Sequence, residues 1–184
     1  MKVIGFVGSP RKNGNTDFMV QQILKGAAEE GAETKIFYLN ELNIKGCQSC
    51  NYCKEKGKCR QQDDMTPLYD EIASADGIVI GSPVYMGYMS GQTKLFIDRW
   101  YAFFQNPVSS LEQGKKIALV FCQMNPDETS YNTTFTSLGQ MLSSLFGLEL
   151  KGILVAGGMK DAETAQKNNE LRQKALTLGK QLAR

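Results

Sequence analysis

The chain opens with an almost continuous apolar run, residues 2–8, that leads directly into Gly8-Ser9-Pro10. A short apolar run bounded by glycine and proline is typical of a strand buried on both faces of a parallel sheet. From Thr16 to Gly31 the apolar positions follow a helical period, which predicts a helix of about four turns capped by Asn15 or Thr16. Residues 34–39 predict a second strand, and a strand-helix-strand unit of this length is expected to be right-handed and parallel.

The rest of the chain repeats this alternation. Further strands are predicted at 76–83, 115–121 and 148–155, and further helices at 66–75, 92–104, 130–146 and 163–183. Five strands alternating with five helices predict a doubly wound α/β fold, with a parallel sheet in the order 2-1-3-4-5 and helices on both faces. We expect one domain spanning residues 1–184, with a cysteine-rich loop inserted at about 40–62.

Composition excludes several classes of function. The net charge is +2 with the basic residues dispersed, so we expect no nucleic-acid partner, and no apolar run is long enough to cross a membrane. We see no export signal and therefore expect a cytoplasmic protein with reduced cysteines. The chain contains no histidine, which leaves a cofactor, thiols, carboxylates or phenols to carry chemistry.

The loop after the first strand, Gly8 to Thr16, predicts an anion site. In a sheet of this order, ligands bind beyond the carboxyl ends of strands one and three, where both Gly-Ser-Pro loops fall. The loop also opens a helix, so backbone N–H groups and the positive end of the helix dipole favour a phosphate there. Asparagine replaces the lysine of a Walker loop, and the Gly-x-Gly-x-x-Gly dinucleotide pattern is absent, so a single phosphate fits best. Taken alone, the motif is also compatible with an ordinary capped loop.

Two separated motifs resemble one known family. Gly8-Ser9-Pro10-Arg11 with Gly14-Asn15-Thr16, and Ser82 to Gly87 followed by Lys94 to Arg99, are similar to the NAD(P)H-dependent FMN reductase and iron-sulfur flavoprotein group of the flavodoxin-like superfamily, over about residues 2–160. The resemblance implies FMN as cofactor and NAD(P)H as a transient electron donor, with chemistry at flavin N5 and no catalytic side chain. The FMN-binding residues that it implies are Ser9, Arg11, Asn13, Gly14, Asn15, Thr16, Pro83, Val84, Tyr85, Met86 and Gly87.

Four of the five cysteines fall within thirteen residues. Cys47, Cys50 and Cys53 have the two-residue spacing of the cysteine run that binds cubane clusters, and Cys59 follows after five more residues. The pattern also resembles that of the iron-sulfur flavoproteins, which implies one 4Fe-4S cluster. Zinc is less expected because structural zinc sites use two cysteine pairs from separated elements. A thiol-rich loop without a metal remains the alternative, and Cys122 is expected to be a buried apolar side chain.

Three functions are compatible with these features. The first is an FMN-dependent oxidoreductase that passes electrons from NAD(P)H to a quinone, nitro compound or flavin. The second is an iron-sulfur flavoprotein that exchanges electrons with a ferredoxin-like partner, and the third is a non-enzymatic FMN-binding module. Four aromatic residues lie close together at the end of one predicted helix: Trp100, Tyr101, Phe103 and Phe104. They cannot all lie on the helix face that packs against the protein core, so we expect some of them to contact a partner subunit in a homodimer or homotetramer.

Overall fold

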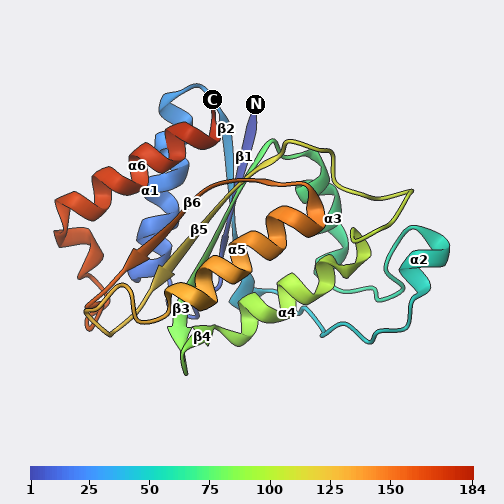
Figure 1. Ribbon diagram of the computed structural model, residues 1–184, viewed down its shortest axis with the longest axis horizontal. Helices are drawn as coiled ribbons and strands as arrows, with labels where there is room; N and C mark the ends of the chain where they lie inside the picture. Colours follow the sequence, from blue (N-terminus) through green and yellow to red (C-terminus); the bar gives the residue numbers. More distant parts are fainter.

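A computed structural model describes residues 1–184 and contains the predicted parallel sheet (Figure 1). Its five long strands run in the order β2-β1-β3-β5-β6, which is the predicted order 2-1-3-4-5 with one label shifted. The shift comes from β4, a short strand that pairs antiparallel with the end of β3. The strand bounds are β1 Lys2–Val7, β2 Glu33–Tyr38, β3 Gly77–Tyr85, β4 Tyr88–Met89, β5 Lys116–Cys122 and β6 Glu149–Ala156.

Helices cover both faces of the sheet, and each face has its own apolar core (Figure 1). α1 and α6 pack on one face, where Met19, Val20 and Leu171 meet the strands. α3, α4 and α5 pack on the other, around Phe6, Phe96 and other large side chains. The helix bounds are α1 Asn15–Glu29, α2 Tyr52–Lys56, α3 Met65–Ser74, α4 Gly91–Arg99, α5 Asn132–Phe146 and α6 Asn169–Leu182. None of them combines the length and apolarity required to span a bilayer.

Several helix ends differ from the sequence predictions. α1 is preceded by Gly14 instead of being capped by Asn15 or Thr16, and the Asn15 side chain bonds to Asp161 and Ala165. α4 ends at Arg99 and continues as a 3-10 turn, Trp100–Ala102, so the predicted helix 92–104 is shorter. The last predicted helix is divided into a 3-10 turn, Ala165–Lys167, and α6, which Asn168 caps by accepting the N–H of Leu171.

Candidate functional site

The loop between β1 and α1 is held in one conformation by its own side chains. Ser9 Oγ accepts the N–H of Arg11 at 3.1 Å. Asn13 has a left-handed backbone, φ 58°, and is fixed by Asp17, which is fully buried and also accepts from Gln21 and Tyr38. The N–H groups of the first turn of α1 have no acceptor inside the helix. The loop therefore presents them, with the positive end of the helix dipole, at the carboxyl edge of the sheet.

A second loop leaves the sheet next to the first, because β1 and β3 are adjacent parallel strands. β3 continues through Pro83 to Tyr85 and turns back at Met86 and Gly87 into β4. Both turn residues have positive φ, 50° and 78°, as a two-residue type I′ hairpin requires. The turn projects Met86 fully into solvent, while Pro83 remains buried.

A buried hydroxyl network joins the two loops. Ser90 caps α4 by accepting the N–H of Thr93, and its Oγ donates to the carbonyl of Gly8 at 2.6 Å. The N–H of Ser90 in turn donates to Ser82 Oγ at 2.9 Å. Gly8 is required in this arrangement, since a Cβ at that position would lie 1.8 Å from Thr93 Oγ1. The first loop, the hairpin and the start of α4 are thus one connected unit.

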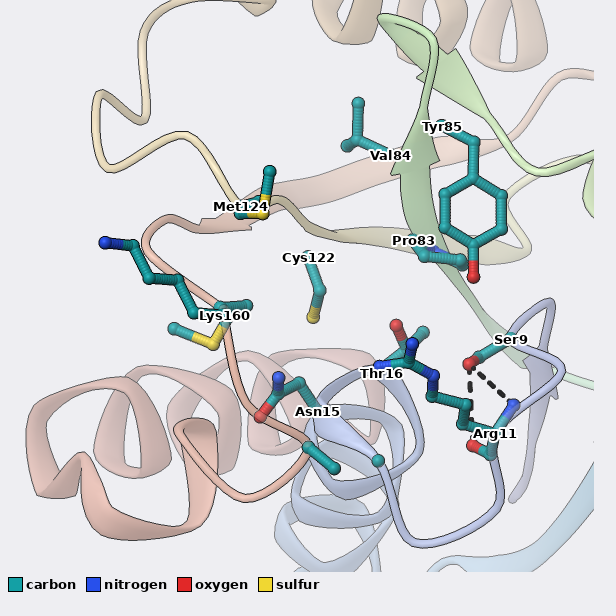
Figure 2. A pocket seen from close by; sticks show the side chains of 13 residues that line it. Ser9, Arg11, Asn15, Thr16, Pro83, Val84, Tyr85, Cys122, Met124 and Lys160 are labelled. Carbon is teal, nitrogen blue, oxygen red and sulfur yellow. Dashed lines mark hydrogen bonds between the residues drawn. The ribbon is translucent and has the colours of Figure 1, made fainter.

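Both loops line a single cavity of about 260 Å³ at the carboxyl edge of the sheet (Figure 2). Arg11 and Lys160 lie on opposite sides of it, and neither forms an ion pair within the chain (Figure 2). The cavity wall therefore carries a cation without an ion-pair partner on each of two sides, together with the N–H groups of the β1–α1 loop. Its lining residues are Ser9, Arg11, Gly14, Asn15, Thr16, Pro83, Val84, Tyr85, Cys122, Met124, Met159, Lys160 and Ala162.

Eight of the eleven sequence-predicted flavin-site residues line this cavity. Asn13, Met86 and Gly87 do not; they shape the loop and the hairpin turn through their left-handed backbones. Asn15 lines the cavity, but its side-chain amide is bonded on both sides, to the carbonyl of Asp161 and to the N–H of Ala165. Its side chain therefore fixes the β6–α6 connection, and only its backbone N–H remains for an anion.

The part of the cavity that follows β5 and β6 carries no signal in the sequence. Met124, Met159, Lys160 and Ala162 belong to no motif, although the carboxyl ends of those strands meet the same edge of the sheet. Cys122 is buried as expected but also lines the cavity, next to Thr16. Burial raises the pKa of its thiol to about 12, so the group is uncharged at neutral pH.

The cysteine-rich segment lies apart from this cavity, beyond the helices on the opposite face of the sheet (Figure 1). All four cysteines line one small cavity of about 20 Å³, with Cys53 buried and Cys47 and Cys50 exposed. Between them, Ser49 and Asn51 have left-handed backbones that curl the segment. Burial raises the pKa of the Cys53 thiol, an effect partly offset by the Lys54 ammonium. No group of cysteines and carboxylates is arranged to hold a single metal ion.

The aromatic cluster at the end of α4 holds this segment against the domain. Trp100 and Phe103 are buried in the core. Tyr101 and Phe104 are half-buried, and their carbonyl groups accept hydrogen bonds from Lys54 Nζ, which also lies 4.1 Å from the centre of the Tyr101 ring. Contact of these aromatic residues with a partner subunit stays a prediction.

Arg99 fastens the segment at the other end. Its guanidinium is buried and forms a two-point ion pair with Asp63, at 2.6 and 3.2 Å. Burial raises the pKa of Asp63, but hydrogen bonds from Arg99 and from the N–H of Lys45 outweigh this effect and hold it below its usual value. Arg99 also donates to the carbonyl of Lys45 at 2.8 Å and to Cys59 Sγ at 3.5 Å.

The sheet order and the cavity at its switch point define a flavodoxin-like protein. Residues 1–161 match the model of the NADPH-dependent FMN reductase family, and the chain belongs to that family.

The chain is also similar to individual curated proteins and solved structures. An iron-sulfur flavoprotein of Methanocaldococcus jannaschii is 48% identical over 99 residues, 54% of this chain and 51% of that protein. One from Archaeoglobus fulgidus is 33% identical over 130 residues, 71% of this chain and 59% of that protein. The chain thus spans about half the length of the curated relatives it matches. A solved flavone reductase superposes with a TM-score of 0.76 at 22% identity, covering 100% of this chain and 62% of the other, which shows the shared fold.

Proposed function

We propose that this chain binds FMN in the crevice between the β1–α1 loop and the β3–β4 hairpin, and that it passes electrons from NAD(P)H to a small acceptor such as a quinone, a nitro compound or a free flavin. The observation that supports the proposal is the cavity of about 260 Å³ shared by these two loops, in a chain that belongs to the FMN reductase family.

The chemistry of the lining fits the cofactor. The β1–α1 loop offers N–H groups, Ser9 and Arg11, which suit a phosphate monoester, and Lys160 adds a cation from across the cavity. The walls that follow β3, β5 and β6 offer Pro83, Val84 and methionine side chains, which suit a planar ring. The cavity is slightly smaller than the ~300 Å³ at the lower end of ligand pockets. Tyr85 at the cavity is exposed, so a nicotinamide or an acceptor could reach a ring held beside it.

When bound, FMN supplies hydride uptake and release at N5. The N–H groups of the β1–α1 loop would hold the phosphate and residues 83–85 would orient the ring, with a neutral Cys122 thiol at the cavity wall. Tyr85, which is 46% exposed, lies at the mouth, where it can border the ring and an incoming substrate. Because the same opening serves donor and acceptor, we expect them to bind in turn.

The test is anaerobic mixing of the flavin-loaded protein with NADPH or NADH, followed by a quinone. We expect the flavin absorbance to bleach with the nucleotide and return with the quinone, and we expect parallel double-reciprocal lines in steady state. A flavin that stays oxidised would favour the non-enzymatic FMN-binding module. Intersecting lines would contradict a single shared opening.

A second candidate function is electron transfer as an iron-sulfur flavoprotein with a ferredoxin-like partner. The observation that favours it is the convergence of Cys47, Cys50, Cys53 and Cys59 on one cavity. Ser49 adds support, because a serine with a left-handed backbone is uncommon and such positions concentrate at functional sites. We further propose that the protein forms a homodimer or homotetramer, which sedimentation tests. We also propose that it is located in the cytoplasm, which cell fractionation tests.

The donor set fits a 4Fe-4S cluster, whereas the enclosed space does not. Four thiols and a buried guanidinium suit a negatively charged cluster. A cavity of about 20 Å³ holds about one water molecule, so the exposed Cys47 and Cys50 must move outward to admit a cluster at the surface. Iron and labile-sulfide analysis of anaerobically purified protein is the test, with Cys122→Ser as matched control for Cys53→Ser. We expect sulfide in the control and much less in Cys53→Ser; sulfide absent from the unmodified protein would exclude the cluster.

A further inference from the structure

A second cavity, larger than the flavin crevice, lies between the end of α2, one face of α3 and the chain that follows α4. α2 and α3 are on the side of the molecule away from α6 (Figure 1). The volume of this cavity is about 510 Å³, and ligand pockets in proteins range from about 300 to 1,000 Å³. It shares no lining residue with the flavin crevice, so the proposed reductase chemistry does not account for it.

One wall of this cavity is a face of α3 that is turned away from the core. Thr66, Tyr69, Asp70 and Ala73 line the cavity, and their spacing of three and four residues places them on one side of the helix. Leu68, on the other side, is buried in the core. α3 therefore meets the core with one face and the cavity with the other.

Two aromatic rings form the apolar part of the lining. Tyr69 and Phe103 pack edge to face, with ring centres 5.3 Å apart and ring planes at 77°. The Tyr69 hydroxyl donates to the carbonyl of Arg99 at 3.1 Å, which fixes the position of its ring. Aromatic pairs of this kind readily add a third ring in an edge-to-face or offset contact. The lining therefore suits a flat aromatic ligand.

Two charged side chains of the lining have no ion-pair partner in the chain. Asp70 contributes a carboxylate from α3, and Lys58 contributes an ammonium from the segment after α2. A carboxylate only accepts hydrogen bonds and an ammonium only donates them, whereas a phenolic hydroxyl does both. Their opposite charges balance, so the lining matches a neutral ligand with hydroxyl groups.

The end of α2 closes the cavity on one side. Gly57 ends this helix with a left-handed backbone, φ 72°, and a Cβ there would lie 2.8 Å from Val108 Cγ1. Glycine thus allows the segment after α2 to approach the chain that follows α4. Both residues line the cavity.

We propose that this cavity is a second ligand site, which binds a neutral, flat aromatic molecule that carries hydroxyl groups. The rings of the ligand pack on Tyr69 and Phe103. One of its hydroxyl groups donates to the Asp70 carboxylate, and another accepts from Lys58. No covalent bond forms or breaks. The inference is independent of the proposed reductase function, because the two cavities have separate walls.

The experiment is a ligand-observed NMR titration of the FMN-saturated protein with 2,6-dihydroxynaphthalene. Excess FMN keeps this probe out of the flavin crevice. We expect saturable binding, and we expect 2,6-dimethoxynaphthalene to bind at least about tenfold more weakly because it has no donor for Asp70. Absence of saturable binding of the diol, or equal affinities of the two compounds, would overturn the inference.

Ala73→Phe tests where the probe binds. Ala73 is exposed on the cavity face of α3, so a phenylalanine side chain fills the cavity without entering the core. The matched control is Ala28→Phe, at an exposed position on α1. We expect the diol to lose its affinity for Ala73→Phe and to bind Ala28→Phe as it binds wild type. Equal binding to the two variants would overturn the inference.

Circular dichroism checks that the variants fold. If Ala73→Phe does not fold, intermolecular nuclear Overhauser effects in the wild-type protein decide the question. We expect them between the probe and the methyl groups of Ala73 and Val108, and their absence would overturn the inference. A protein that binds no FMN would overturn the proposed function alone, because the same titration, variants and Overhauser effects test the second site in the flavin-free protein.

Discussion

Replacing Ser90 with alanine tests the link between the two flavin-binding loops. Ser90 is fully buried and caps α4 by accepting the N–H of Thr93, and the loss of such a cap costs about 1 kcal/mol. Its Oγ is also the donor to the Gly8 carbonyl at 2.6 Å, and leaving a buried acceptor without a partner costs about 1–3 kcal/mol. We therefore expect Ser90→Ala to lower the free energy of unfolding by about 2–4 kcal/mol.

The assay is urea denaturation of the flavin-free protein, with Ser144→Ala as the matched control. Ser144 is exposed on α5, and its hydroxyl bonds only to the carbonyl of Met141, so its loss is expected to change stability by less than about 0.5 kcal/mol. With a denaturant slope of about 2 kcal/mol per M, Ser90→Ala lowers the midpoint by about 1–2 M. Midpoint shifts of equal size in Ser90→Ala and Ser144→Ala would refute the reasoning.

Three further predictions concern charge and pH. Arg11→Gln and Lys160→Gln should each weaken FMN binding only about fivefold, or about 1 kcal/mol, because both cations are exposed to solvent. Flavin-fluorescence titration should show a smaller loss of affinity at high salt. The control Lys25→Gln, at an exposed position on α1, should leave the affinity unchanged. Asp63→Asn should cost about 3–5 kcal/mol of stability at neutral pH by leaving a buried unpaired guanidinium. Because the folded-state pKa of Asp63 lies below its usual 3.8, the stabilisation is present above that value and is lost as pH falls through the folded-state pKa, so wild type and Asp63→Asn should converge in acid; an unchanged gap would contradict the ion pair. Burial raises the pKa of Cys122 from 9.0 to about 12, so its contribution to the free energy of unfolding is lost as pH rises through that range. Cys122→Ala should therefore lose less stability than wild type over the same pH range. An identical dependence of stability on pH in the two proteins would contradict the burial of the thiol.

The sheet was predictable because apolar runs and turn residues carry strong local signals. Residues 2–8 and 76–83 each contain a run of apolar residues that leads into Gly-Ser-Pro, which is typical of buried strands in a parallel sheet. The structure pairs Val3 with Gly77 and Val7 with Gly81 in parallel register. The short pieces were missed because five residues in α2 and two in β4 are too few for a periodic pattern.

The candidate site was predictable only where residues share a local motif. Ser9, Thr16 and Pro83 lie in such motifs and line the crevice. Met124 and Lys160 have no motif, because their place depends only on where β5 and β6 end in the folded sheet.

The contacts of Arg99 likewise leave no local pattern in the sequence. Its ion pair with Asp63 crosses 36 positions, and its bond to Cys59 crosses 40. Tertiary structure, not residue spacing, brings the end of a flavodoxin-like motif to the cysteine segment.

The most direct test of the phosphate site is to compare the affinities of FMN and riboflavin for the flavin-free protein by fluorescence titration. Two or more charge-assisted hydrogen bonds to the phosphate, at about 1.5–3 kcal/mol each, should make FMN bind at least about 100-fold more tightly than riboflavin. Equal affinities of the two flavins, or no binding of either, would contradict the phosphate site in the loop between β1 and α1.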